Sequence, residues 1–276
     1  MKIELITTGY FYADGGAMFG SIPKTAWERR YPANEDNTCV LAMRSLLVTT
    51  DGGKVILIDN GVGNKHLKQL SYYKFFDLKD LSDELAKRNK SLFQITDVVL
   101  THLHFDHCGY TTFRDEESKE LFLSFPHATH WVSRAQWDNC LSPNPLEINS
   151  FFIENIWPVA DVTELKLINE DTSLCPEIDL RLYNGHTPGQ IVPYINTPEQ
   201  TLVFAGDVIP LAPHVSPEWI SAYDTYPVTS YHEKVRLLEE AASEGQAVVY
   251  CHDAYTPCTT VKRVSDFYKT DRKIMI

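Results

Sequence analysis

Three histidines and an aspartate crowd into the short stretch THLHFDHCG, which spans residues 101–109. The ligand-type side chains in it are His102, His104, Asp106 and His107. Imidazole nitrogens and carboxylate oxygens suit zinc and neighbouring transition metals. Because alternate residues of an extended segment point to the same side, His102 and His104 can address one ion. Asp106 and His107 follow where the chain turns into a helix, and they can address a second ion beside the first.

Other ligand-type residues stand at the ends of short apolar runs. The runs VILID, TLVFAGD and AVVYCHD bring the chain to Asp59, Asp207 and His252, respectively. Such runs are typical of strands that are buried on both faces of a sheet. Open α/β sheets place their ligand sites at the carboxyl ends of strands. The ends of separate strands can therefore converge on one site.

Helices are predicted between these strands. The segment 229–245 opens with Ser230 and Glu233 in the spacing of a capping box and closes at Gly245. A second, shorter helix is predicted over 81–91, before the strand that leads into the histidine-rich stretch. No internal repeat or long linker divides the chain, so we expect one domain over residues 1–276.

The motifs, taken in order, resemble the metallo-β-lactamase superfamily of hydrolases. THLHFDHCG looks like the signature of this superfamily, and NGHTPGQ (184–190), FAGD (204–207) and YCHD (250–253) look like its later motifs. ILIDNG resembles its early turn, with Asn60 in place of a threonine. The resemblance implies an α/β fold, a four-layer αβ/βα sandwich of two mixed β-sheets flanked by helices. It also implies two metal ions in the cleft between the sheets.

The resemblance further implies a role for each ligand-type residue. The first metal would be held by His102, His104 and His186, and the second by Asp106, His107 and His252. Asp207 would bridge the two metals, and Asp59 would support the site from behind the ligands. Two such ions can share a hydroxide and polarise the bond that it attacks. We expect zinc, although manganese, iron or cobalt would also fit, and His104 favours zinc and hydrolysis over diiron redox chemistry.

Within the superfamily, the chain is similar to the subgroup of acyl-homoserine lactonases and methyl-parathion-type hydrolases. Asp207 argues against an antibiotic-hydrolysing lactamase, and the segment 206–227 looks like the loop of this subgroup. One departure is Pro210, which stands where many lactonases have a tyrosine. Tyr223 is a candidate replacement for that tyrosine. His214 and Asp224 lie on the same loop.

The predicted function is the opening of an ester-like bond, most plausibly in a lactone, by a hydroxide held between the metals. Asp106 would take part in proton transfer to the leaving alkoxide, and Tyr223 and His214 are further catalytic candidates. Asp224 could contact substrate or orient a ligand. The alternatives are hydrolysis of a phosphotriester or phosphodiester, or a non-catalytic metal-binding scaffold with a closed pocket.

The composition of the chain disfavours some classes of binding partner. The net charge of −12 disfavours nucleic acid and anionic membranes, so a small ester, lactone or phosphoester is the expected partner. A second copy of the chain, in a homodimer, is another possible partner. The N-terminal segment has no long apolar stretch and no cleavage site, so we expect a cytoplasmic protein.

The six cysteines show no C-x-x-C pair, which favours reduced thiols. Cys108 and Cys251 adjoin predicted ligands. In extended segments their side chains should point away from the metals. We therefore predict that both cysteines are packing residues.

Overall fold

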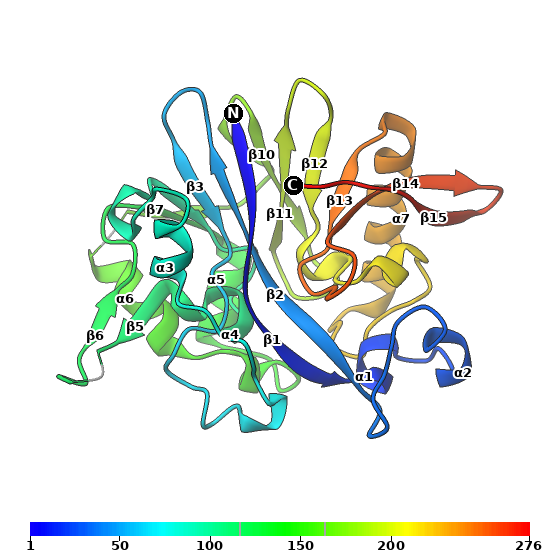
Figure 1. Cartoon of the computed structure of the whole chain (residues 1–276), viewed down its shortest axis with the longest axis horizontal. Coiled ribbons are helices and arrows are strands. Elements are labelled where there is room, and N and C mark those ends of the chain that lie inside the picture. The colour runs from blue at the N-terminus through cyan, green and yellow to red at the C-terminus, as the bar shows by residue number, and fades with distance from the viewer. Residues whose placement is uncertain (116, 163) are drawn as a thin grey trace. The chain divides into compact units, whose positions relative to one another are not determined.

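The computed structural model describes residues 1–115, 117–162 and 164–276 of the chain (Figure 1). The chain divides into two compact units. The first unit comprises Met1–Tyr10 and Met43–Asn169, and the second comprises Phe11–Ala42 and Glu170–Ile276. Each unit has its own β-sheet and its own cluster of buried apolar side chains. A single domain over the whole chain stays a prediction.

The sheet of the first unit has six strands and carries the two early motifs. Its order is β1 (Lys2–Asp14), β2 (Thr38–Thr49), β3 (Val55–Ile58), β4 (Asp97–Val99), β7 (Thr129–Ser133) and β8 (Leu165–Ile168). Strands β2 and β3 are antiparallel, whereas β3, β4, β7 and β8 run parallel, so the sheet is mixed. Every residue of β3 and β4 is buried, as the apolar runs predicted. The carboxyl ends of β3 and β4 therefore lie side by side.

Short helices pack on this sheet. They are α3 (Leu81–Ala86), α4 (Phe105–Cys108), α5 (Arg134–Leu141) and α6 (Ile153–Val162), and a small hairpin is formed by β5 (Thr112–Arg114) and β6 (Leu121–Leu123). Asp80 caps α3 by accepting a hydrogen bond from the Ser82 backbone N–H. The helix is shorter than the predicted range 81–91, because the chain reaches a left-handed conformation at Asn89.

The sheet of the second unit has seven strands. Its order is β15 (Phe267–Lys273), β14 (Cys258–Val264), β13 (Ala247–Val249), β12 (Thr201–Phe204), β11 (Gln190–Asn196), β10 (Ile178–Tyr183) and β9 (Thr172–Cys175). Only the pair β12–β13 is parallel among the pairings in this sheet, which is therefore also mixed. Phe204 is paired with Val249 at the end of that ladder. The residues that follow β12 and β13 consequently emerge at the same edge.

The second unit also contains the longest helix, α7 (Pro227–Glu244), beside β14 (Figure 1), together with α1 (Gly15–Phe19) and α2 (Lys24–Trp27). Leu237, Leu238 and Ala241 of α7 lie in the apolar cluster of this unit. Gly245 ends the helix in the left-handed conformation, as predicted. Among the described residues, no helix is long and apolar enough to cross a membrane.

The predicted capping box at the start of α7 is wrong. The helix begins earlier, with Tyr226 as the N-cap residue and Pro227 at the first helical position, where a proline loses no hydrogen bond. Ser230 therefore lies inside the first turns. The Glu233 carboxylate instead accepts hydrogen bonds from the backbone N–H groups of Asn184 and Gly185.

Candidate metal centre

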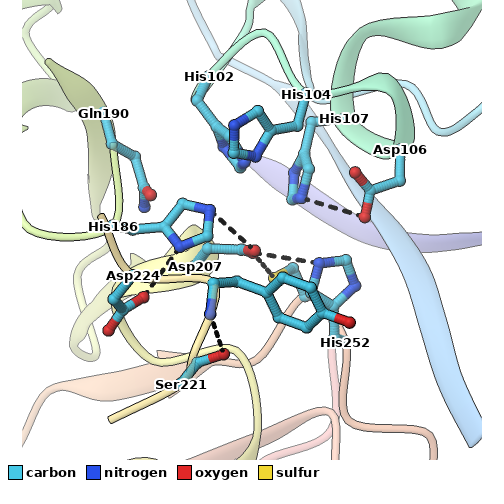
Figure 2. Close-up of polar contacts among 12 residues, drawn as sticks. His102, His104, Asp106, His107, His186, Gln190, Asp207, Ser221, Asp224 and His252 are labelled. Atoms are coloured by element: carbon cyan, nitrogen blue, oxygen red, sulfur yellow. Dashed lines mark hydrogen bonds and ion pairs between the residues drawn. The ribbon is translucent and has the colours of Figure 1, made fainter. Parts of the chain in front are cut away.

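The first unit gathers four of the predicted ligands, two in the loop after β4 and two in α4. The ligand nitrogens of His102 and His104 lie within 4.8 Å of each other. The His102 ring centroid is 4.5 Å from that of His104 and 4.0 Å from that of His107. Asp106 Oδ2 is 3.7 Å from His107 Nε2, as the dashed line in Figure 2 marks. The short turn into α4 thus places an aspartate and three imidazoles in one group.

Asp59 lies behind two of these histidines. It follows β3 in a left-handed conformation and is 1% exposed. Its carboxylate accepts hydrogen bonds from His107 Nδ1, the Thr101 backbone N–H and the Thr101 hydroxyl, each at 2.8 Å. The Thr101 oxygen lies 3.0 Å from His102 Nδ1, so it can accept from that ring. Burial raises the pKa of the Asp59 carboxyl, and the neighbouring His107 opposes this rise.

Glu147 supports the remaining histidine of this group. Its Oε2 lies 3.1 Å from His104 Nε2, and the residue is 3% exposed. Glu147 belongs to an irregular loop after α5, 43 positions from His104 in the sequence. No motif or hydrophobic pattern in the sequence marks it, so its role could not be predicted from the sequence.

The second unit gathers the other three predicted ligands. His186 lies in the loop between β10 and β11, Asp207 follows β12, and His252 follows β13. The Asp207 carboxylate lies between the two imidazoles, with Oδ2 3.4 Å from His186 Nε2 and Oδ1 3.1 Å from His252 Nε2 (Figure 2). Asp207 thus presents one carboxylate oxygen to each imidazole, and it could be shared by metals that the two histidines would hold.

In both histidines of the second unit, Nδ1 has an oxygen partner, while Nε2 faces Asp207. Asp224 Oδ1 lies 2.9 Å from His186 Nδ1, a contact that Figure 2 shows as a dashed line. His252 Nδ1 donates to the Ala42 carbonyl oxygen at 2.7 Å. Of the two roles considered for Asp224, the structure shows the one in which it orients a histidine.

The loop that carries His186 is fixed to α7. Glu233 of this helix accepts hydrogen bonds of 2.8 Å from the N–H groups of Asn184 and Gly185. A Cβ atom on Gly185 would lie 2.4 Å from Ser230 Cα, so only glycine allows this close approach. The position of His186 therefore depends on the packing of its loop against the start of α7.

The prediction that Cys251 points away from the ligands is wrong. Its thiol donates a hydrogen bond to Asp207 Oδ1 at 3.2 Å, and the ligand atoms of Asp207, Cys251 and His252 lie within 4.8 Å of one another. Strand β13 ends at Val249, so the alternation of an extended strand no longer applies at Cys251. Cys108, by contrast, is a buried member of the apolar cluster of its unit, as predicted.

The remaining loop residues have different environments. His214 is fully buried, its Nε2 lies 2.9 Å from the Met18 carbonyl oxygen, and its ring stacks on Phe19 with centroids 5.1 Å apart. Burial lowers the pKa of His214 to about 3. These contacts pack His214 into the second unit, and its catalytic role stays a prediction. The Pro210 carbonyl accepts a hydrogen bond of 3.1 Å from the His252 backbone N–H, so this residue supports a predicted ligand.

Tyr223 is 39% exposed in the second unit. Its backbone N–H donates to the Ser221 hydroxyl at 3.1 Å, which fixes the backbone of this turn. An exposed phenol can reach a small molecule. Its catalytic role stays a prediction.

The chemistry of the donors fits a metal. Each imidazole has one ring nitrogen beside an oxygen: Thr101 for His102, Glu147 for His104, Asp59 for His107, Asp224 for His186 and Ala42 for His252. Histidines that bind metals almost always donate the N–H of their other nitrogen in this way, because it fixes the tautomer and the ring orientation. The nitrogen left to bind a metal would then be Nδ1 in His104 and Nε2 in the other four.

Known proteins resemble this chain in sequence motif and in fold. The model of the metallo-beta-lactamase superfamily matches residues 44–110. A probable metal-dependent hydrolase from Staphylococcus aureus has a similar structure, with a TM-score of 0.88 and 28% identity over 99% of this chain and 98% of its own. No curated protein sequence gives a significant match.

Two more distant structures show the same fold at 20% identity. AidC, a dizinc quorum-quenching lactonase in complex with a product, has a TM-score of 0.76, with coverage of 99% of this chain and 95% of its own. The hydrolase AbOPH of the beta lactamase superfamily also has a TM-score of 0.76, with coverage of 99% and 94%. The chain has the metallo-beta-lactamase fold, as its motifs predicted, and the sequence model of that superfamily matches part of it, residues 44–110. It shares this fold over almost its full length with the probable metal-dependent hydrolase from Staphylococcus aureus, and its own donor groups could hold metal ions.

Proposed function

We propose that the two donor groups form one dinuclear metal centre within a single domain. The observation that carries this proposal is that all five histidines are oriented by an oxygen behind the ring, and Asp207 presents one oxygen to each of two histidines. The first metal is assigned to His102, His104 and His186, the second to Asp106, His107 and His252, and Asp207 bridges them. Zinc suits this set of imidazoles and carboxylates.

In the proposed reaction, the protein's own residues orient the metal-binding histidines and transfer a proton. When bound, two divalent metals supply a nucleophilic hydroxide at neutral pH and polarise the substrate's carbonyl oxygen. Asp59 and Asp224 hold His107 and His186 in the tautomer that leaves Nε2 toward the metal. Asp106, beside His107, is 12% exposed at its side chain; it can take the proton of the attacking hydroxide and pass it to the leaving alkoxide.

A lactone is the proposed substrate, and an acyl-homoserine lactone is its most plausible form. Support comes from the similarity in fold to AidC, which is described as a lactonase. The loop 206–227 supplies Asp207 and Asp224 together, and it also carries Tyr223, which we propose to contact the leaving group. A small uncharged ester also suits a chain with a net charge of −12, since a polyanion would be repelled.

Pro210 favours a second candidate, the hydrolysis of phosphotriesters or phosphodiesters. A proline has no side-chain donor to stabilise an oxyanion, and here its carbonyl is already bonded to the His252 N–H. If no other residue replaces the lactonase tyrosine, a substrate with a better leaving group would be preferred. The same hydroxide can attack phosphorus.

Hydrolysis of the two substrate classes can be compared directly. We would measure proton release from a medium-chain acyl-homoserine lactone by the zinc-loaded protein, with His102→Ala as the blank, beside an aryl phosphotriester. Lactone turnover well above the blank supports the proposal. Turnover of the phosphotriester alone moves the assignment to phosphoesters, and no turnover of either leaves a metal-binding scaffold.

A further inference from the structure

We propose that Glu147 is a positioning residue that fixes His104 with Nδ1 directed toward the metal. The inference rests on the role of His104 as a ligand in the proposed function. It starts from a carboxylate that is 3% exposed and has no place in the family motifs. Burial of an ionised carboxylate is costly unless hydrogen bonds compensate it. Glu147 must therefore be held by several donors.

Two asparagine side chains of the first unit donate hydrogen bonds to the Glu147 carboxylate. Asn139 Nδ2 of α5 donates to both carboxylate oxygens, at 3.3 and 3.2 Å, and Asn144 Nδ2 donates to Oε1. The side chain of Asn144 also accepts the backbone N–H of Leu146 at 2.9 Å, which closes the turn before Glu147. The carboxylate is thus fixed in place independently of His104.

This arrangement sets the tautomer of His104. Because both amide groups donate, the carboxylate acts as an acceptor, and the hydrogen of the imidazole must be on Nε2, 3.1 Å from Oε2. The lone pair is then on Nδ1. His102 and His107 are held at Nδ1 and leave Nε2 for the metal, so His104 is the exception in the group. The Phe151 ring, 5.1 Å from that of His104, limits rotation of the imidazole.

The test measures metal affinity in the full chain, with zinc and cobalt(II) as probes in competition with a chromogenic chelator. We expect Glu147→Ala to lower the affinity by about 10–100-fold, the usual effect of losing such a support. Glu147→Gln should lose less, because the amide oxygen can still accept the hydrogen bond from Nε2. The visible spectrum of the cobalt protein should change in both variants, since the geometry of a ligand changes.

A matched control is the pair of His66 and Glu154 in the same unit. His66 Nε2 lies 3.2 Å from Glu154 Oε2, but His66 is not a proposed ligand. Glu154→Ala therefore breaks a similar contact and should leave metal affinity and the cobalt spectrum unchanged. A double-mutant cycle separates an effect that acts through His104 from a general destabilisation of the fold. In a His104→Ala background, Glu147→Ala should cause no further loss of metal affinity.

Two results would overturn the inference. One is metal binding by Glu147→Ala, or by Glu147→Leu if the alanine variant does not fold, within about twofold of the unaltered protein and with the same cobalt spectrum. The other is an undiminished effect of Glu147→Ala in the His104→Ala background. Because no substrate is present, a failure to hydrolyse lactones would count against the proposed function without affecting this result.

Discussion

At the scale of the residue, the candidate centre depends on what lies behind each histidine. The spacing of THLHFDHCG was enough to predict four ligand-type side chains in one group, and the structure places them together in the first unit. Their supports could be predicted only in part. Asp59 ends a strand in a recognisable turn, whereas Glu147 comes from an irregular loop in which nothing but the folded contacts reveals its role. Cys251 was missed because the strand ends before it.

Asp59→Asn should weaken metal binding without unfolding the protein. An asparagine keeps the size of the side chain, but its amide nitrogen cannot accept hydrogen bonds, so the support of His107 and Thr101 is impaired. We expect a loss of about 10–100-fold in metal affinity, measured by chelator competition. Asp80→Asn, at the cap of α3, is the control. Equal affinities for Asp59→Asn and the unaltered protein would contradict this role.

Asp106→Asn should lower lactone turnover by about 100-fold or more, as expected when a group that transfers protons is lost. The metal assigned to His102, His104 and His186 should remain largely bound. Turnover and metal content are measured on the same preparation. Full activity of the variant would show that Asp106 does not transfer the proton.

At the scale of the element, α7 and the loop 184–190 act together. The sequence pattern predicted the helix and its end at Gly245, but it misplaced the start. Ser230 and Glu233 have the spacing of a capping box, yet Pro227 extends the helix by one turn and Glu233 is used to bind the loop of His186. A local pattern cannot show that a side chain has a partner about 50 residues away.

Gly185→Ala tests this connection. The new Cβ would lie 2.4 Å from Ser230 Cα and 2.5 Å from Ser230 N, so the loop or the helix must shift. We expect at least a tenfold loss of metal affinity, because His186 moves with its loop. Gly245→Ala is the control: its φ of +69° costs about 1 kcal/mol of folding free energy, but no atom lies within 4 Å. It should lower the melting temperature and leave metal binding unchanged.

At the scale of the whole molecule, the resemblance of the motifs to the metallo-β-lactamase superfamily implied two mixed sheets, and the structure has them. The burial of two histidines makes the free energy of unfolding depend on pH. Burial lowers the pKa of His130 to about 4 and that of His214 to about 3, from an ordinary value of 6.5. Below pH 6.5 the unfolded chain therefore takes up protons that the folded protein does not.

The free energy of unfolding should consequently fall as the pH drops from about 6.5 to about 4. Each of the two histidines contributes a slope of up to about 1.4 kcal/mol per pH unit. Urea unfolding of the metal-free protein at several pH values measures this slope, since release of metal would add its own pH dependence. His130→Gln should reduce the slope, and an unchanged slope would contradict the effect of burial.

The central claim is that the two donor groups form one dinuclear centre. X-ray absorption of the zinc-loaded protein at the zinc edge, combined with the metal content per chain, tests it most directly. We predict two zinc ions per chain and a zinc–zinc distance of about 3.5–4 Å, with the distance lost in Asp207→Ala. One zinc per chain, or two without a zinc–zinc signal, would contradict the claim.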